Sequence, residues 1–442
     1  MRVATVVHQY PPKYFTGTEQ YAHAIGRGLA SRGLDVGVFA LDPDFRQHTP
    51  LWRSRSESVD GLEVDFHSFW AGIDRDWERL DYLNPIMAEK FSAYLRKRQV
   101  DVVHIFHLRM LGGGLVDCAR EAGARVVVSL MDFWWLCPRI IMMRSSGELC
   151  TGPSAAGSSC VECNQPALAE AARSGPEGDA YSRLREADPE TSFCANDVQA
   201  RVWAAQRRAG FLREQLAKAD VLVAPTDYLA RVYAENGVPS DRLRVLSYGV
   251  EVARKAAPNG SGKGPLVFGF FGTIIGHKGP RVIVDAMESV RGDCRLVIWG
   301  RASDFPAYSD PLAEKASNDP RISIRPPFAR RDLQHILEEV DVLVVPSLWH
   351  ENSPFVMLEA RSAGVPMIAS NFGGLAEVLL DGVEGDLFEP GDVGGLAAVM
   401  QRMIDRPDVV ASYRSACRPA KSLDTAVAEF HGLYEEILSA PA

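Results

Sequence analysis

Two glutamates, Glu351 and Glu359, are separated by seven residues and lie on either side of a predicted strand-to-helix turn. The preceding run, 340–346, is mostly apolar and β-branched and ends in proline, which predicts a buried parallel strand. Ser353 and Pro354 have the residue types expected at a helix N-cap and at the first helical position. We therefore expect Glu351 in the loop at the strand's carboxyl end and Glu359 more than one turn into the helix.

The groups between these two carboxylates indicate the chemistry of the turn. The first amides of a helix, together with the helix dipole, favour an anion such as a phosphate. Carboxylates accept hydrogen bonds from hydroxyls. The arrangement suits a diphosphate with a sugar on one side and a ribose on the other. The alternative is an ordinary capped helix with two solvated glutamates.

Two more glycine-containing turns follow predicted strands in this half of the chain. Glycine lets backbone approach a ligand closely, and a lysine at a helix start offers a point charge to phosphate. Ligands of open α/β sheets bind at the carboxyl ends of the strands, so we expect the three turns to converge on one crevice. Taken singly, each also fits a plain surface turn. The residues concerned are Gly272, Thr273, Lys278, Gly373 and Gly374.

The first half of the chain holds two further candidates. Gly17 and Thr18 follow the first predicted strand and open a helix, so their amides are suited to the same diphosphate; a plain turn with Thr18 as N-cap is the alternative. His107 follows the strand 102–106, at its carboxyl end, and is a candidate for the cleft. His104, inside that strand, fits a structural histidine better.

The alternation of strands and helices predicts two doubly wound α/β halves. A Gly- and Pro-rich segment at 256–265 is the best linker candidate, which gives domains at 1–255 and 256–423. We expect strands in the first half at 3–7, 36–41, 64–69, 102–106, 126–130, 221–224 and 243–246, and in the second half at 266–271, 296–299, 322–324, 342–345 and 367–369.

Length, charge and hydropathy narrow the class of protein. A chain of 442 residues is too long for one ordinary core. The net charge of −9 argues against a general nucleic-acid binder. Neither a signal peptide nor a run of about eighteen apolar residues is apparent, so we expect a cytoplasmic protein.

Four cysteines gather in an insertion at about 132–201, which interrupts the α/β rhythm and is expected to have little core of its own. In a reducing compartment such grouping favours metal ligation over disulfides. Four thiolates suit a tetrahedral structural zinc; an iron–sulfur cluster and unliganded thiols are the alternatives. The four residues are Cys137, Cys150, Cys160 and Cys163.

The segment 201–213 is basic, aromatic and helical in pattern. An amphipathic domain helix is the favoured interpretation. The other is a helix that rests on an anionic membrane at the inner face and reaches a lipid-linked acceptor.

Together these motifs resemble the GT-B glycosyltransferases of family 4, retaining enzymes that use nucleotide-sugar donors. The resemblance covers nearly the whole chain and is densest over 266–405. It implies two Rossmann-like doubly wound domains that face each other across an interdomain cleft. The domain at 1–255 would bind the acceptor, with a C-terminal helix at about 424–438 packed back on it. The domain at 256–423 would bind the donor.

Carried over by position, the resemblance implies three catalytic residues. Lys278 would neutralise the leaving diphosphate, Glu351 would contact the transferred sugar, and His107 would meet the sugar or the acceptor. Glu359 would bind the ribose. The remaining implied donor contacts are Gly17, Thr18, Gly272, Thr273, Ser353, Pro354, Phe355, Val356, Gly373 and Gly374.

Two positions depart from the family pattern. Thr273 stands where an arginine is common, and Met131 where related domains often have a histidine. The resemblance implies retaining, metal-independent transfer of a sugar to a hydroxyl of a polysaccharide, glycolipid or metabolite, with no cofactor needed for catalysis. A nucleotide-sugar-binding scaffold with little turnover is the alternative. Phosphorylase-like chemistry would need a pyridoxal phosphate lysine context, which the sequence does not show.

Overall fold

A computed structural model of the chain describes residues 1–44, 52–69, 77–154, 157–174, 197–251 and 264–440. The chain divides into two compact units. Unit 1 comprises Met1–Ser247 and Leu423–Ala442, and unit 2 comprises Tyr248–Ser422. The expected boundary at 255/256 lies outside the described residues, as does most of the linker candidate.

Unit 1 is built on an eight-stranded sheet of order β3-β4-β2-β1-β5-β6-β7-β8. All neighbours pair in parallel except β3 and β4, which form an antiparallel hairpin at one edge. The strand β3 was not among the expected strands. The strands are β1 (Arg2–Val7), β2 (Asp35–Leu41), β3 (Trp52–Val59), β4 (Leu62–Phe69), β5 (Val102–Ile105), β6 (Arg125–Ser129), β7 (Val221–Ala224) and β8 (Leu243–Val245).

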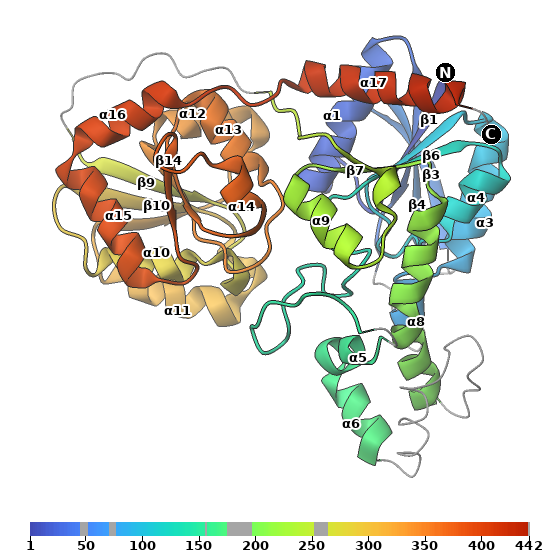
Figure 1. Cartoon of the computed structure of the whole chain (residues 1–442), viewed down its shortest axis with the longest axis horizontal. Coiled ribbons are helices and arrows are strands. Elements are labelled where there is room, and N and C mark those ends of the chain that lie inside the picture. The colour runs from blue at the N-terminus through green and yellow to red at the C-terminus, as the bar shows by residue number, and fades with distance from the viewer. Residues whose placement is uncertain (45–51, 70–76, 155–156, 175–196, 252–263, 441–442) are drawn as a thin grey trace. The chain divides into compact units, whose positions relative to one another are not determined.

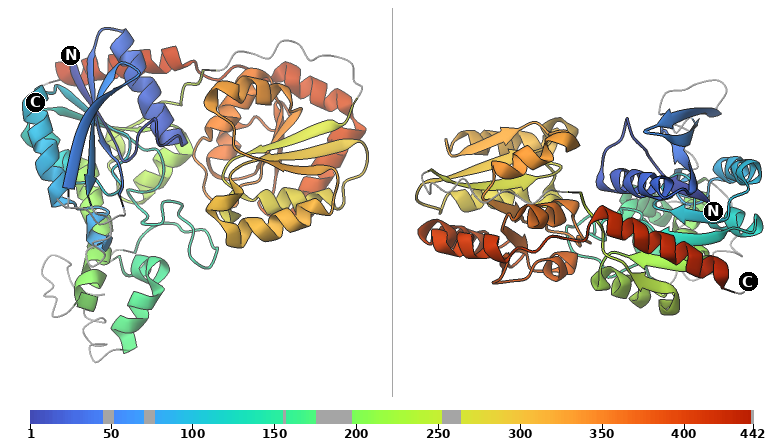
Figure 2. Two further views of the ribbon diagram at one scale, coloured as in Figure 1. Left: turned by 180° about the vertical axis from the view of Figure 1, so that it is seen from behind. Right: turned by 90° about the horizontal axis from the view of Figure 1, so that it is seen from above.

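Helices cover the sheet of unit 1, and the C-terminal helix α17 packs against α1 (Figures 1 and 2). α17 is fastened to the sheet by the Tyr434 hydroxyl, 2.6 Å from His104 Nδ1. His104 Nε2 lies 2.8 Å from Ser129 Oγ, so His104 is a structural residue. The helices of unit 1 are α1 (Gly17–Ser31), α2 (Trp77–Leu80), α3 (Pro85–Arg98), α4 (Leu115–Glu121), α5 (Ser158–Asn164), α6 (Pro166–Ser174), α8 (Asp197–Lys218), α9 (Asp227–Glu235) and α17 (Leu423–Ser439).

The insertion has a small apolar core. Helices α5 and α6 pack on the first half of α8 and bury Val161, Leu168, Ala169 and Val202 together. This packing covers an apolar face of the segment 201–213, which is part of α8. Contact of that segment with a membrane stays a prediction. Among the described residues, no helix combines the length and apolar character needed to cross a bilayer.

Unit 2 has a six-stranded, wholly parallel sheet of order β11-β10-β9-β12-β13-β14. Its strands are β9 (Leu266–Phe271), β10 (Cys294–Trp299), β11 (Ile322–Arg325), β12 (Val342–Val345), β13 (Met367–Ser370) and β14 (Gly385–Phe388). Its helices are α10 (Pro280–Met287), α11 (Pro306–Ser317), α12 (Leu333–Glu338), α13 (Phe355–Ala363), α14 (Gly373–Val378), α15 (Val393–Asp405) and α16 (Pro407–Ala416). Short 3₁₀ turns include η3 (Gly276–Lys278) and η5 (Arg330–Asp332).

Two apolar clusters form the core of unit 2. Side chains of α10, α11, α15 and α16 join one cluster, and side chains of α12, α13 and α14 join the other. Alternate residues of the strands supply both clusters: Phe270 and Val344 belong to the first, and Phe271 and Val345 to the second. Since successive strand residues point to opposite faces, the sheet lies between two helical layers.

Strand order fixes where each unit can hold a ligand. The order reverses between β9 and β12 in unit 2 and between β1 and β5 in unit 1. At such a switch point the connections leave to opposite sides and open a crevice beyond the strands' carboxyl ends. The expectation of two doubly wound α/β domains is thus confirmed.

Candidate active site

Lys278 and Glu351 meet at the switch point of unit 2. Lys278 closes η3 after β9, and Glu351 lies in the loop after β12. The Lys278 Nζ atom is 2.5 Å from Glu351 Oε1. Glu351 is buried, whereas Lys278 is partly exposed. Two residues 73 positions apart thus form one charged pair at the crevice.

Further donors hold the Glu351 carboxylate. Ser347 Oγ and Trp349 Nε1 each lie 2.9 Å from Glu351 Oε1. The Lys278 ammonium also lies 5.0 Å from the centre of the Trp349 ring, a cation–π contact. Among the described residues, the side-chain donors to this carboxylate all reach Oε1. Such an arrangement fixes the orientation of the carboxylate through Oε1.

The three turns of unit 2 contact one another. The Leu348 amide donates to the His277 carbonyl at 2.8 Å, which joins the turn after β9 to the loop after β12. The Gly374 amide donates to the Glu351 carbonyl at 2.8 Å, which adds the turn after β13. A Cβ atom on Gly374 would lie 1.4 Å from the Asn352 carbonyl oxygen. Only glycine permits this approach, so the expected convergence within unit 2 is present.

The other glycines of these turns have backbone roles. Gly272 has φ +156° and donates its amide to the Trp299 carbonyl, and Gly373 has φ +61°. Thr273 follows directly in the turn and is exposed. Such left-handed backbone favours glycine because it carries no Cβ.

Helix α13 begins one residue later than expected. Pro354 is the N-cap, with φ −61° and ψ 127°, and Phe355 is the first helical residue. Ser353 is buried and makes no cap, so its assignment as N-cap is wrong. The fixed φ of proline suits both positions, and residue type alone could not separate them. The Phe355 ring stacks on Tyr248 at 4.7 Å, with Val356 next in the first turn.

Glu359 is buried in α13 and forms an ion pair with Arg330 of η5. Burial raises the pKa of the Glu359 carboxyl, and Arg330 acts in the opposite direction. Arg330 was not among the expected site residues. Arg330 lies after β11, so a residue beyond the carboxyl end of a further strand also contacts α13.

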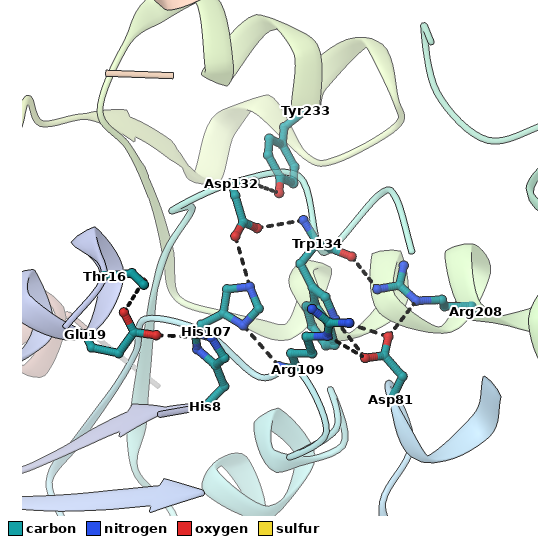
Figure 3. A network of polar contacts seen from close by, with 10 residues as sticks. All are labelled: His8, Thr16, Glu19, Asp81, His107, Arg109, Asp132, Trp134, Arg208 and Tyr233. Carbon is teal, nitrogen blue, oxygen red and sulfur yellow. Dashed lines mark hydrogen bonds and ion pairs between the residues drawn. The ribbon is translucent and has the colours of Figure 1, made fainter. Parts of the chain in front are cut away.

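A second polar network occupies the switch point of unit 1 (Figure 3). His8 follows β1 and His107 follows β5, and their ring centres are 4.1 Å apart. Glu19 Oε1 lies 3.3 Å from His8 Nε2. The other Glu19 oxygen accepts a hydrogen bond from Thr16, the N-cap of α1.

Both ring nitrogens of His107 are engaged by the protein. The Arg109 amide donates to Nδ1 at 3.1 Å, so Nε2 carries the proton and faces Asp132 Oδ2 at 3.0 Å. His107 is also buried. In this arrangement His107 orients Asp132, whose side chain is 20% exposed. The expected direct contact of His107 with sugar or acceptor stays a prediction.

Gly17 is the first residue of α1 and Thr18 the second, so both amides belong to the helix N-terminus. The N-cap is Thr16, and the alternative that placed Thr18 there is wrong. Glu19 at the third position completes this turn through its bond with Thr16. The helix start thus carries a buried carboxylate of its own.

Burial sets the charge state of this network. It lowers the pKa of His8 well below its usual value, with His107 and Arg109 adding to the effect. It raises the pKa of the Glu19 carboxyl, against the hydrogen bond from Thr16. His8 is therefore neutral at pH 7. Neutral imidazole and carboxylate groups suit the recognition of hydroxyls.

Asp81 and Arg208 extend the network into the insertion. Arg208 Nε lies 3.3 Å from Asp81 Oδ2, and Arg208 Nη2 donates to the Trp134 carbonyl at 2.5 Å. The Tyr233 hydroxyl donates to the Asp132 carbonyl at 2.6 Å. Arg208 of α8 and Tyr233 of α9 thus fix the backbone around Asp132.

The four clustered cysteines are all partly buried, and all are free thiols. They line one small cavity. Within the part of the chain that the structure describes, no three His, Cys, Asp or Glu side chains are already arranged as metal ligands. Zinc at this cluster remains a prediction.

Sequence reasoning missed several site residues. They lie within a few residues after a strand or at a helix start, which is the signal that could have found them. His8 follows the first strand, and Asp132 follows β6 closely. The missed residues are His8, Glu19, Asp132, Arg330, Ser347 and Trp349.

The fold and these two sites define a class: a two-domain α/β protein with polar groups at the switch point of each sheet. Comparison with known proteins assigns the family. Residues 265–406, within unit 2, match the family described as "Glycosyl transferases group 1". Residues 16–177, within unit 1, match the "Glycosyl transferase 4-like domain".

Curated relatives include D-inositol 3-phosphate glycosyltransferases. The protein of Xylanimonas cellulosilytica is 32% identical over 229 residues, which cover 46% of this chain and 54% of the relative. That of Mycolicibacterium smegmatis is 27% identical over 212 residues, 45% of this chain and 48% of the relative. The chain thus matches about half the length of these relatives.

Solved structures share the fold over nearly the whole chain. HepE from Anabaena, solved in complex with UDP, has a TM-score of 0.66 at 14% identity and covers 99% of this chain and 100% of its own. Sucrose-phosphate synthase from Thermosynechococcus elongatus has a TM-score of 0.67 at 17% identity, with 100% of both chains covered. The chain belongs to the GT-B glycosyltransferases of family 4 type.

Proposed function

We propose that this protein transfers a sugar, with retention of configuration, from a nucleotide-sugar donor to a hydroxyl of an acceptor. Unit 2 holds the donor, and unit 1 supplies the acceptor side. The acceptor is a polysaccharide, a glycolipid or a metabolite. The observation that carries the proposal is the Lys278–Glu351 pair at the switch point of unit 2.

The donor chemistry is assigned from the groups around this pair. Lys278 lies where a diphosphate would meet the start of α13, so ammonium and helix amides act on the same anion. Glu351, fixed through Oε1, offers Oε2 to the sugar hydroxyls. The structural neighbour HepE was solved in complex with UDP, which supports a nucleoside diphosphate as the leaving group.

In the transfer step, the bond between the sugar carbon and the diphosphate breaks through an oxocarbenium-like state. Negative charge grows on the departing diphosphate, where Lys278 and the oriented amides stabilise it. A phosphate oxygen of the leaving group accepts the proton of the acceptor hydroxyl as the new bond forms. The reaction needs no metal ion in this scheme, because the protein's own cation and amides stabilise the developing charge.

The acceptor side of the proposal rests on unit 1. Asp132, oriented by His107 and partly exposed, is suited to accept a hydrogen bond from an acceptor hydroxyl. Curated relatives are named for an inositol phosphate, itself a polyhydroxyl compound with an anionic group. Arg109, whose side chain is 44% exposed, is the nearby cation for such a group.

The test uses Lys278→Ala and Glu351→Ala. A thermal-shift panel of UDP-, GDP- and ADP-sugars first identifies the donor, and release of the nucleoside diphosphate then measures turnover. Loss of one preorganised donor to a developing anion typically costs about 10²–10³ in rate, or about 2.7–4 kcal/mol. We expect each variant to lose at least tenfold in turnover.

Lys315→Ala is the matched control, because Lys315 is a unit 2 lysine paired with Asp285 and Glu288 on the surface. It should retain wild-type turnover. Near-normal turnover in both site variants would contradict the proposal. Binding of a donor without any product across a broad acceptor panel would favour the scaffold function instead.

A further inference from the structure

Four cysteines from three separate segments line one cavity of unit 1, outside the polar networks described above. Cys137 lies three residues after Trp134. Cys150 follows Leu149, which forms an antiparallel bridge with Met143. Cys160 and Cys163 lie three residues apart on α5, on one side of the helix.

Backbone amides around the cavity are aimed at sulfur. The Gly152 amide donates to Cys150 Sγ at 3.4 Å. The amides of Arg139 and Met142 hydrogen-bond to the Cys137 thiol. Met142 has φ +45° and Ile140 φ +72°, which are rare conformations for residues other than glycine. Met142 therefore adopts a rare backbone conformation while directing its N–H group at the Cys137 sulfur.

Positive charge also surrounds the thiols. Arg139 and Arg144 line the same cavity. Burial raises the pKa of Cys137 and raises that of Cys160 to about 11, and Arg208 acts in the opposite direction on both. In Cys137 and Cys160, burial therefore favours the protonated thiol. A divalent cation reverses this preference because it binds thiolates directly.

We propose that Cys137, Cys150, Cys160 and Cys163 bind one Zn²⁺ ion as a tetrathiolate site. Binding releases the thiol protons and leaves a complex of net charge −2, which the three arginines around the cavity offset. In the structure the sulfur atoms line the cavity without being gathered as ligands.

The site would fix the segment that carries Asp132. The Cys137 amide donates to the Phe133 carbonyl at 2.7 Å and closes the turn 133–137, and the Trp134 amide of that turn donates to Asp132 Oδ1 at 2.8 Å. Arg208 fastens the Trp134 carbonyl from α8. Zinc would thus anchor the turn from one end, while His107 holds Asp132 at the other.

The test measures metal in the full chain purified without chelator. We expect about one zinc per chain by mass spectrometry of the metal. Titration with an organomercurial should release that zinc in proportion to the thiols modified. Cys160→Ser and Cys163→Ser should each lower zinc content and make residues 132–174 more susceptible to limited proteolysis. Cys118→Ser, a thiol of α4 outside the cluster, is the matched control and should keep the full zinc content.

Should the serine variants fail to fold, Co²⁺ reconstitution of the wild-type chain still decides the matter through its thiolate charge-transfer absorption. Absence of zinc, iron in place of zinc, or a disulfide among the four cysteines would overturn the proposal. Free reaction of all four thiols with a thiol reagent in the native protein would overturn it as well. None of these readouts depends on glycosyl transfer, so the two proposals stand or fall separately.

Discussion

Among single residues, His104 is a buried histidine that makes the free energy of unfolding depend on pH. Its ring is fully buried between the Tyr434 hydroxyl and Ser129. Burial lowers the pKa of His104 to about 3. The unfolded chain binds a proton at this residue below about pH 6.5, while the folded chain stays neutral. The stabilisation is present above that pH and is lost as pH falls toward 3.

We expect the free energy of unfolding of unit 1 to fall between pH 7 and pH 5, by up to about 1.4 kcal/mol per pH unit for this residue. His104→Asn should reduce that slope, as measured by urea unfolding at both pH values. Other buried histidines such as His67 contribute to the wild-type slope but cancel in the difference between variants. His431→Asn, on the accessible side of α17, is the control. An unchanged slope in His104→Asn would contradict this account.

At the residue scale, the sequence indicated which polar residues follow the strands, but not which of these residues contact one another. Lys278 and Glu351 were expected because each follows a buried strand. Their contact at 2.5 Å depends on strand order, since β9 and β12 are neighbours only once the sheet is wound. Arg330 was missed for the same reason: its partner Glu359 is 29 residues away.

At the scale of elements, strands buried on both faces were predictable and edge strands were not. The strands β7, β9 and β12 have the expected bounds because their residues are continuously apolar. β3 is polar and mostly exposed, so it lacks that signal. Asp60 and Gly61, with φ +49° and +87°, form the turn of the β3–β4 hairpin. An Asp-Gly pair is a recognised hairpin signal, and it could have revealed β3.

Packing between α1 and α17 depends on one small residue, Gly28. A Cβ atom there would lie 2.4 Å from Val427 Cγ2. Alanine would gain up to about 1 kcal/mol in helix propensity, but overpacking a filled contact costs about 1–3 kcal/mol. We expect Gly28→Ala to lower the free energy of unfolding, as measured by denaturant titration.

A double-mutant cycle tests whether the contact is the cause. Adding Val427→Ala removes the overlapping methyl groups, so the double variant should lose less than the sum of the single variants. Gly432→Ala in α17 is the matched control, because a Cβ there meets nothing within 4 Å. It should leave stability unchanged or raise it. Additive effects in the cycle would argue against the contact.

At the scale of the whole molecule, both units use the same strand order around their switch points. β4-β2-β1-β5-β6-β7 in unit 1 and β11-β10-β9-β12-β13-β14 in unit 2 reverse at corresponding places. The polar residues of each unit gather at that reversal. The alternation of strands and helices was enough to predict this plan. The core of the insertion was not predictable, because its apolar residues are few and spread over three helices.

Unit 1 is completed by the far end of the chain, whereas unit 2 is one continuous segment, Tyr248–Ser422. Truncation after Ser422 removes α17 and its buried side chains, including Phe430, Leu433 and Ile437. Each such side chain contributes about 1.5–3 kcal/mol on burial, and together with Val427 and Tyr434 they approach the whole stability of a typical domain, about 5–15 kcal/mol. We therefore expect unit 1 to unfold in the truncated chain.

Unit 2 should survive the same truncation, because its two apolar clusters and its sheet are complete within it. The hydrogen bond from the Val250 amide to the Lys421 carbonyl is also retained. Hydrogen exchange separates the two outcomes: amides of β9 and β12 should stay protected while those of β1 and β5 exchange rapidly. Equal loss of protection in both sheets would show that the units fold as one, and equal retention would show that α17 is dispensable. Only the split result fits a chain whose two cores are built separately and whose last helix belongs to the first.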